Sequence, residues 1–274
     1  FSSKSKKIHV DIDPSEIGKI ISVDVPIVGD VKDVLEKLNK VVESSTHGDW
    51  LKRIETLKED HPSLKLPDTD KLLARQVIRD ISEVTEGNAT IVTGVGQHQM
   101  WAAQHYEFKN PCSLLTSGGS GTMGYEVPAA MGAQVAKPDG TIWSIAGDGG
   151  FQMTLCELAT IVENKLPVKF AILNNGFLGM VRQWQEIFFE SSYVSTGYSG
   201  NPDFVKLAEA YGIKGIRVTD KTQVKPAIEE AMEHDGPVLI DFIVEQEENV
   251  YPMIPSGMTV KDMIEEPSSE RVTA

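Results

Sequence analysis

The sequence has few cysteines, no long apolar run and a shortage of basic residues, and each shortage excludes a class of protein. The two cysteines, Cys112 and Cys156, are far apart, so neither a disulfide framework nor a cysteine zinc site is indicated. No apolar run approaches the roughly 18 residues of a membrane span, and the segment FSSKSKKIHV does not read as a signal peptide. We therefore expect a protein of the reducing cytoplasm that does not act at a membrane.

The charge balance excludes a second class of function. Lys and Arg number 26 against 40 Asp and Glu, a formal net charge of -14, whereas binding to nucleic acid or to an anionic membrane needs a basic patch. An anionic ligand would have to be held by backbone N–H groups or by a metal. The 274 residues allow one large domain or two modest ones. The sequence starts without Met and enters a strand almost at once, so we expect it to begin inside a larger protein.

The first part of the chain reads as the end of an α/β domain. Strands are predicted over residues 7–13 and 20–25, and an amphipathic helix over 29–44 that opens at Asp30, a good N-cap. We take 1–45 as the end of this domain and the charged, Pro-containing segment 46–68 as a linker.

Residues 69–250 alternate between apolar strands and helices, and 251–274 read as a C-terminal tail whose last part, TVKDMIEEPSSERVTA, we expect to be mobile. Near-continuous apolar strands between helices predict an α/β fold, a doubly wound, mostly parallel sheet covered on both faces. Ligands of such sheets bind outside the carboxyl ends of the strands.

Three glycine-bearing turns follow three of these strands, over 93–99 (TGVGQHQ), 116–124 (TSGGSGTMG) and 146–150 (AGDGG). Glycine is common in α/β turns for conformational reasons alone, but three such turns at one sheet edge favour a phosphate-binding floor. Gly94 and Gly96 begin a GxGxxG pattern that ends in Gln99, and no GK[ST] is present. The dinucleotide and P-loop motifs therefore fit poorly.

A carboxylate and two amides follow two successive apolar strands. Twenty-four residues separate Gly149 from Asn174, enough for one helix and one strand, so Asp148 can meet Asn174 and Asn175 at one edge. Such oxygen ligands suit Mg²⁺, which completes its shell with phosphate and water. The alternative is that Asp148 caps the following helix while the asparagines form an Asx turn.

These turns resemble the acetolactate (acetohydroxyacid) synthase family of thiamine diphosphate-dependent enzymes, whose metal–diphosphate signature is GDG followed by NN one helix and one strand later. The resemblance covers VGQHQMWAAQ, TSGGSGTMGYEVPAA, GDGGFQM and NNGFLGMVRQWQ, and extends to HVDIDPSEIGK, VPIVGDVK and YPMIPSGM. It implies a thiamine diphosphate-binding fold for 69–250 and an FAD-binding middle domain that ends within 1–45.

The resemblance also implies roles for individual residues. Asp148, the Asn175 side chain and the Phe177 carbonyl would bind Mg²⁺, and Met123 would lie under the thiazolium ring. The remaining contacts to thiamine diphosphate would come from Val95, Gly96, Gln97, His98, Gly121, Gly147, Gly149, Gly150 and Met180. A core role for Met123 and a structural role for His98 are the alternatives.

Two further groups of residues follow from the same resemblance. Trp184, with Met180 one turn earlier on the same helix, and Ser256 would line the pocket for the second ketoacid and for inhibitors. Structural FAD would contact Asp11, Ile12, Asp30 and Val31, for which the alternative is ordinary strand-end and N-cap residues.

The implied activity is decarboxylation of pyruvate and transfer of the two-carbon unit to pyruvate or 2-ketobutyrate, a step of branched-chain amino acid biosynthesis. In this family the glutamate that activates the cofactor lies in an upstream domain. The active-site pocket is shared between two subunits of a dimer or tetramer, and this assembly can bind a small regulatory subunit. We therefore expect this chain alone to be inactive, in the cytoplasm or in a plastid. The alternatives are a related carboligase, oxidase or decarboxylase (glyoxylate carboligase, pyruvate oxidase) and a non-catalytic cofactor-binding module.

Overall fold

The computed structural model describes residues 4–62, 64–198 and 200–266 and divides the chain into two compact units, Phe1–His61 and Pro62–Ala274. In the first unit, β1 (Ile8–Asp11) pairs in parallel with β2 (Val25–Val28), and α1 (Val31–Leu38) follows. Asp30 is the N-cap of α1 and its side chain accepts a hydrogen bond from the Lys32 amide at 2.8 Å.

Two predicted element bounds in this unit need correction. The strand expected over 20–25 starts only at Val25, because residues 14–21 form turns and bends around Gly18, whose φ is 70°. The helix expected to reach residue 44 ends at Leu38, and Val41 and Val42 beyond it are largely exposed, so no packing extends it. The segment 46–68, expected as a linker, contains helix α2 (Gly48–Asp60).

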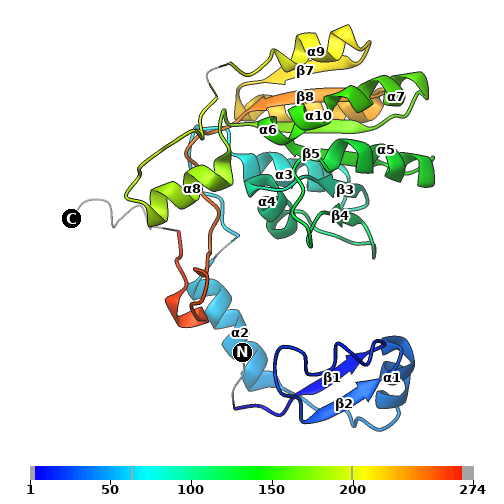
Figure 1. The fold of residues 1–274 in the computed structure, drawn as a ribbon, viewed down its shortest axis with the longest axis vertical. Helices are drawn as coiled ribbons and strands as arrows, with labels where there is room; N and C mark the ends of the chain where they lie inside the picture. Colours follow the sequence, from blue (N-terminus) through cyan, green and yellow to red (C-terminus); the bar gives the residue numbers. More distant parts are fainter. Residues whose placement is uncertain (1–3, 63, 199, 267–274) are drawn as a thin grey trace. The chain divides into compact units, whose positions relative to one another are not determined.

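The second unit is built on a six-stranded sheet with the order β4-β3-β5-β6-β8-β7, in which every pair is parallel (Figure 1). The strands are β3 (Thr90–Thr93), β4 (Leu114–Thr116), β5 (Ile142–Gly147), β6 (Lys169–Asn174), β7 (Lys214–Val218) and β8 (Val238–Ile243). The predicted parallel α/β sheet is confirmed. β3, β5, β6 and β8 are buried almost throughout, which is why they read as continuous apolar runs.

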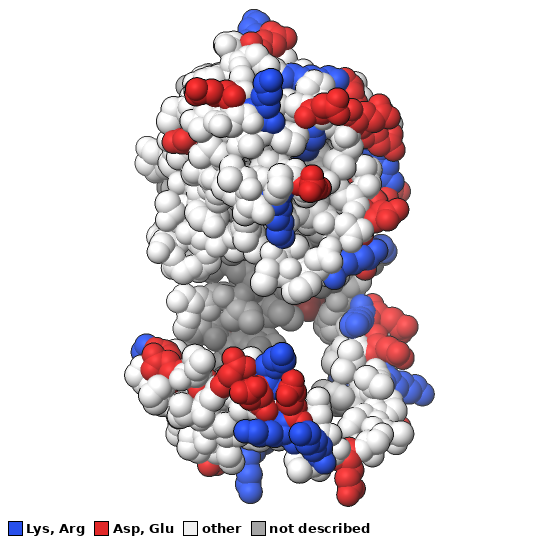
Figure 2. All heavy atoms as spheres, turned by 90° about the vertical axis from the view of Figure 1, so that its right-hand side faces the viewer, with Lys and Arg blue, Asp and Glu red and all other residues white. Residues whose placement is uncertain are grey.

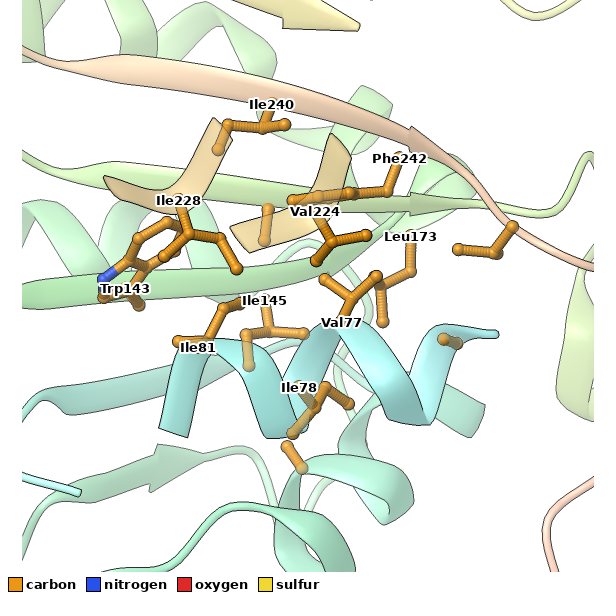
Figure 3. Close-up of a cluster of buried hydrophobic side chains, with 14 of the residues drawn as sticks. Val77, Ile78, Ile81, Trp143, Ile145, Leu173, Val224, Ile228, Ile240 and Phe242 are labelled. Atoms are coloured by element: carbon orange, nitrogen blue, oxygen red, sulfur yellow. The ribbon is translucent and has the colours of Figure 1, made fainter. Parts of the chain in front are cut away.

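Helices cover both faces of this sheet. One apolar core joins the sheet to α3 (Ala74–Val84), α4 (Gln97–His105) and α10 (Val224–Glu233). Figure 3 shows Val77 and Ile81 of α3 on the side of the helix that faces Trp143 and Ile145 of β5. A second core joins the other face to α5 (Glu126–Ala136), α6 (Asp148–Met153), α7 (Leu158–Glu163) and α9 (Phe204–Ala210), and α8 (Gly179–Phe188) follows β6.

The single helix predicted after β5 is interrupted. α6 ends at Met153, the 3₁₀ turn η1 (Leu155–Glu157) follows, and α7 then runs to Glu163. The Thr154 hydroxyl donates to the Gly124 carbonyl at 2.8 Å, so the chain at the break is tied to the loop before α5. The interruption anchors α6, the helix that starts at Asp148, against that loop.

The segment after β8 packs back on the second unit. Arg75 forms a buried ion pair with Glu248 at 2.6 Å and also contacts Glu266. Met253 and Ile264 form an antiparallel bridge around the 3₁₀ turn η3 (Val260–Asp262), and a second 3₁₀ turn, η2 (Lys221–Gln223), precedes α10. Part of the tail expected to be mobile is therefore ordered by contacts, and residues 267–274 lie outside the described residues.

Two observations bear on the surface. Among the residues that the structure describes, no helix has the length and apolar character required to cross a membrane. Acidic and basic side chains are interspersed on the face seen in Figure 2, which carries no large basic patch.

Candidate functional site

The site lies where the strand order reverses. From β3 the chain moves to β4 at one side of the sheet, and β5 then pairs on the other side of β3. The turns after β3 and β5 therefore diverge to opposite faces and leave a crevice at the carboxyl ends of the two strands. Gly94–Gly96 and Gly147–Gly150, both predicted as phosphate-binding turns, meet there.

A hollow of about 520 Å³, a volume that includes space open to solvent, occupies this crevice. It is lined by residues of the turns after β3, β5 and β6 with single apolar contributions from elsewhere: Val95, Gly96, Gln97, His98, Trp101, Met123, Gly147, Asp148, Gly149, Gly150, Leu173, Asn175, Phe177, Leu178, Gly179, Met180, Val181 and Val244. We call it the central hollow. Every residue expected to contact thiamine diphosphate except Gly121 lines it.

Asp148 connects the ends of β5 and β6. Its Oδ1 accepts from the Gly149 amide at 3.0 Å, and its Oδ2 accepts from the Gly176 amide at 2.9 Å and from Asn201 Nδ2 at 2.6 Å. The N-cap of α6 is Gly147, without a side-chain cap, so the interpretation of Asp148 as a helix cap is wrong. Burial raises the pKa of Asp148 to about 6, and these hydrogen bonds offset the shift only in part.

The two asparagines after β6 point to different places. Asn175 lines the hollow; its Oδ1 accepts from the Phe177 amide at 3.1 Å, and its Nδ2 donates to Gln97 Oε1 at 3.4 Å. Asn174 instead donates to Asp241 at 3.0 Å. Asn175 therefore does form the Asx turn considered as an alternative, and it also lines the hollow together with Asp148.

The donor set fits a magnesium–diphosphate site. Asp148, Asn175 and Phe177 line one hollow and offer a carboxylate, an amide oxygen and a main-chain carbonyl. The described residues contain no cluster of three or more His, Cys, Asp or Glu that would form an all-protein cage. Mg²⁺ takes few protein ligands and shares the remainder of its shell with phosphate and water, so a single carboxylate suits it.

Two helix N-termini face the same hollow. α4 has Gly96 as its N-cap, with φ 148°, and α6 has Gly147, and neither cap provides a side-chain bond to the first amides. Uncapped N–H groups favour an anion. His98, in the first turn of α4, is buried, and its Nε2 has no hydrogen-bond partner among the described residues. Burial lowers the pKa of His98 to about 4, so the ring is neutral, and it is not a histidine with both nitrogens satisfied.

Glycine at 149 leaves room for a close approach of Tyr198. A Cβ there would collide with the hydroxyl of Tyr198, which belongs to the loop between α8 and α9. The Tyr198 amide donates to the Gly176 carbonyl at 2.8 Å, and this places the loop over the junction of the two turns. With a larger residue at 149, the Tyr198 side chain would have to move.

Several predicted site residues lie elsewhere. Gly121, with φ 65°, does not line the central hollow, and of its turn only Met123 does. Trp184 is 45% exposed and packs edge-on against Phe188, with ring centroids 5.4 Å apart. Ser256 is exposed in the segment after β8. The structure thus does not bring Trp184 and Ser256 into the hollow.

The residues expected at FAD belong to the first unit. Asp11 ends β1, Ile12 follows it, and Asp30 and Val31 follow β2, so all four lie at the carboxyl edge of the two-stranded sheet. Asp30 has the N-cap role of the alternative interpretation, and its N-cap bond to the Lys32 amide uses only its Oδ1.

Sequence reasoning missed other side chains at the site. Trp101, Leu178 and Val244 line the hollow, while Gln183 accepts from Gln97 Nε2 at 2.9 Å. Asn201 binds Asp148, although it lies 53 residues along the chain. Its Asn-Pro step just before α9 marks a turn, which was the one available signal, but its partner depends on tertiary structure.

Comparisons with known proteins agree with this geometry. Residues 94–242 match the family described as thiamine pyrophosphate enzyme, C-terminal TPP binding domain, and residues 1–38 match the thiamine pyrophosphate enzyme central domain. The first match spans the turns after β3, β5 and β6 that form the hollow. Thiamine pyrophosphate is the compound named thiamine diphosphate above.

Among characterised proteins, the chain is 46% identical to the acetolactate synthase large subunit of Corynebacterium glutamicum, over 96% of this chain and 44% of the relative. It is 44% identical to acetolactate synthase 1, chloroplastic, of Zea mays, over 96% of this chain and 43% of the relative. It is 45% identical to the acetolactate synthase of Mycobacterium bovis, over 94% of this chain and 44% of the relative. The chain thus spans less than half the length of these relatives.

Proposed function

Because the chain belongs to the thiamine pyrophosphate enzyme family, we propose that it is the cofactor-binding part of an acetolactate synthase. The reaction joins the two-carbon unit of pyruvate, after loss of CO₂, to a second 2-ketoacid, pyruvate or 2-ketobutyrate. The observation that carries this proposal is the junction of Asp148, Asn175 and Phe177 at the central hollow, in a chain that is 44% to 46% identical to the three acetolactate synthases named above.

Mg²⁺ would be held by one carboxylate oxygen of Asp148, by Asn175 Oδ1 and by the Phe177 carbonyl. The hydrogen bond from Gly176 to Asp148 and the Asx turn at Asn175 fix these oxygens before the metal arrives. Gln97, which accepts from Asn175 Nδ2, keeps the amide oxygen rather than the nitrogen available to the metal. Preorganised ligands lose less conformational freedom when they bind.

The diphosphate would lie against the amides of Gly149 and Gly150 and the first turn of α4, with His98 as a neutral hydrogen-bonding partner. This arrangement binds an anion without a basic side chain in the hollow lining, which suits a chain with a net charge of -14. Thiamine diphosphate supplies the electron sink for decarboxylation when it is bound. Met123 and Met180 provide apolar contacts that orient the ring and exclude water from the reacting carbon.

The remaining active-site groups would come from outside this chain. The resemblance places an activating glutamate in an upstream domain of a second subunit. Structural FAD would contact Asp11, Ile12, Asp30 and Val31 of this chain. A small regulatory subunit would be a further partner. Trp184 and Ser256 would reach the acceptor pocket in that assembly. We place the enzyme in the cytoplasm, or in a plastid if the source is a plant.

The metal assignment is tested by Asp148→Ala in the assembled enzyme. We expect calorimetry to show loss of Mg²⁺-dependent binding of thiamine diphosphate, because the only carboxylate of the described lining is removed. Asp139→Ala, at an exposed position, is the matched control and should bind as the wild type does. Unchanged affinity in Asp148→Ala would remove Asp148 from the metal site.

The reaction class is tested by the products of the assembled enzyme. Pyruvate alone should give 2-acetolactate, and pyruvate with 2-ketobutyrate should also give 2-aceto-2-hydroxybutyrate. Free acetaldehyde or acetyl phosphate as the main product would identify a decarboxylase or an oxidase instead.

A further inference from the structure

Glu126 is a buried carboxyl group for which the proposed reaction has no use. It is the first residue of α5 and is fully buried. Neither of its carboxylate oxygens has a hydrogen-bond partner of regular geometry within the described part of the chain, although the backbone N–H groups of Gly124 and Glu126 lie close enough to stabilise the charged form in part. An isolated buried carboxyl is costly, and it persists where its surroundings or its function require it.

The carboxyl lies directly behind the two glycine turns of the central hollow. A Cβ placed on Gly94, after β3, would collide with the Glu126 carboxylate, and one on Gly150, after β5, would come within 2.8 Å of Glu126 Oε1. Glu126 does not itself line the hollow. Its carboxyl group therefore lies between the two turns that would surround the diphosphate, on the side opposite the ligand.

Among the residues that the structure describes, no cation compensates a charge at this position. α5 packs against β3, β5, α6 and η1. The two strands carry no titratable side chain, while α6 contributes Asp148 and η1 contributes Cys156 and Glu157. His98, in the first turn of α4, is neutral. Burial raises the pKa of Glu126 to about 7, and the nearby backbone N–H groups of Glu126 and Gly124 oppose the rise only in part.

A diphosphate bound with its Mg²⁺ would still add net negative charge on the other side of the same two turns, because the ionised diphosphate carries more negative charge than the metal carries positive charge. Like charge and low dielectric both favour the protonated form of a carboxyl group. We propose that Glu126 takes up a proton when thiamine diphosphate binds, and that its neutral carboxyl holds the turns after β3 and β5 at the spacing that the diphosphate requires. The proton comes from bulk water to one carboxylate oxygen, and no other bond changes. Glu126 is thus a positioning residue, and this proposal rests on the proposed function.

The test uses Glu126→Gln, which keeps the volume and removes the ionisation, in the assembled enzyme. Calorimetry measures the affinity for thiamine diphosphate with Mg²⁺ between pH 6 and 9. Above pH 7, the wild type should lose about tenfold in affinity per pH unit relative to the variant, because only its protonated form binds well. Near pH 6 the two proteins should bind alike. Glu163→Gln, at an exposed position of α7, is the control and should follow the wild type.

Proton uptake gives a second readout that a merely structural role would not change. At pH 8, titrations in buffers of different ionisation enthalpy should show the wild type taking up close to one proton more than Glu126→Gln. Equal uptake and parallel pH profiles would overturn the proposal. If the wild type itself fails to bind thiamine diphosphate, the proposed function fails instead, so the two failures are distinguishable. Glu126→Asp, which keeps the ionisation but shortens the side chain, should retain the pH dependence with weaker binding at every pH.

Discussion

At the scale of single residues, Asn201 determines the orientation of the Asp148 carboxylate. Its Nδ2 donates to Asp148 Oδ2 at 2.6 Å and to Asn174 Oδ1 at 3.1 Å, while its own oxygen accepts from Gln152 at 3.1 Å. Asp148 Oδ2 is thereby occupied twice, whereas Oδ1 accepts from the Gly149 amide alone among the described residues. Oδ1 is therefore the oxygen available to a metal.

We expect Asn201→Ala to weaken Mg²⁺ binding about 10- to 100-fold, the usual effect of removing an outer partner of a metal ligand. The cause is loss of the hydrogen bond that holds the Asp148 carboxylate in one orientation. The measurement is a Mg²⁺ titration at saturating thiamine diphosphate, followed by calorimetry. Asn164→Ala, at an exposed position where the side chain bonds only to the Thr160 carbonyl, is the control. Wild-type Mg²⁺ affinity in a folded Asn201→Ala protein would contradict this role.

At the scale of elements, the sequence predicted the strands and turns that are determined by residues close together along the chain. The apolar strands of the second unit, and the turns with Asp148 and Asn175, follow from local patterns and from the rule that parallel strands end at one edge. The break between α6 and α7 was missed because it depends on Thr154 bonding to Gly124, 30 residues away. Asn201 and Glu126 were missed for the same reason: each acts through a partner that only the folded sheet brings near.

α3 is tied to the chain after β8 by one buried cation. Arg75 Nε donates to Glu248 at 2.6 Å, and its other nitrogens donate to Glu266 at 2.7 and 3.0 Å. Glu248 also accepts from the Ala74 amide at 2.9 Å, and its main-chain carbonyl accepts from Gln97 at 2.8 Å. This ion pair therefore connects the start of α3 with a residue that lines the central hollow.

We expect Arg75→Ala to lower the free energy of unfolding by about 3–5 kcal/mol, because it leaves Glu248 buried without its partner. Urea denaturation followed by circular dichroism measures the change. The control is Lys71→Ala, which removes the more exposed ion pair with Glu245 and should cost at most about 1 kcal/mol. Equal decreases in the free energy of unfolding in the two variants would show that the buried ion pair contributes no more to stability than the exposed one.

At the scale of the whole molecule, the described lining of the central hollow contains one carboxylate, Asp148, which is the proposed metal ligand. The hollow is partly open to solvent, and large apolar side chains of α8 and of the loop after it are exposed, including Trp184 at 45%, Phe189 at 60% and Val194 at 65%. A carbon that reacts as a nucleophile needs both an acid to activate the cofactor and a site closed to water. Neither is supplied by the residues that line this hollow.

We therefore expect the purified 274-residue chain to bind thiamine diphosphate weakly with Mg²⁺ and to form no acetolactate from pyruvate. The metal and diphosphate contacts lie within the chain, so Mg²⁺-dependent binding should remain detectable by calorimetry and should disappear in Asp148→Ala. Turnover needs the activating carboxylate and the cover over the hollow, so an acetolactate assay should give a signal only with the assembled enzyme. Acetolactate formed by the chain alone would mean that activation of the cofactor does not need the upstream domain, and would contradict this prediction.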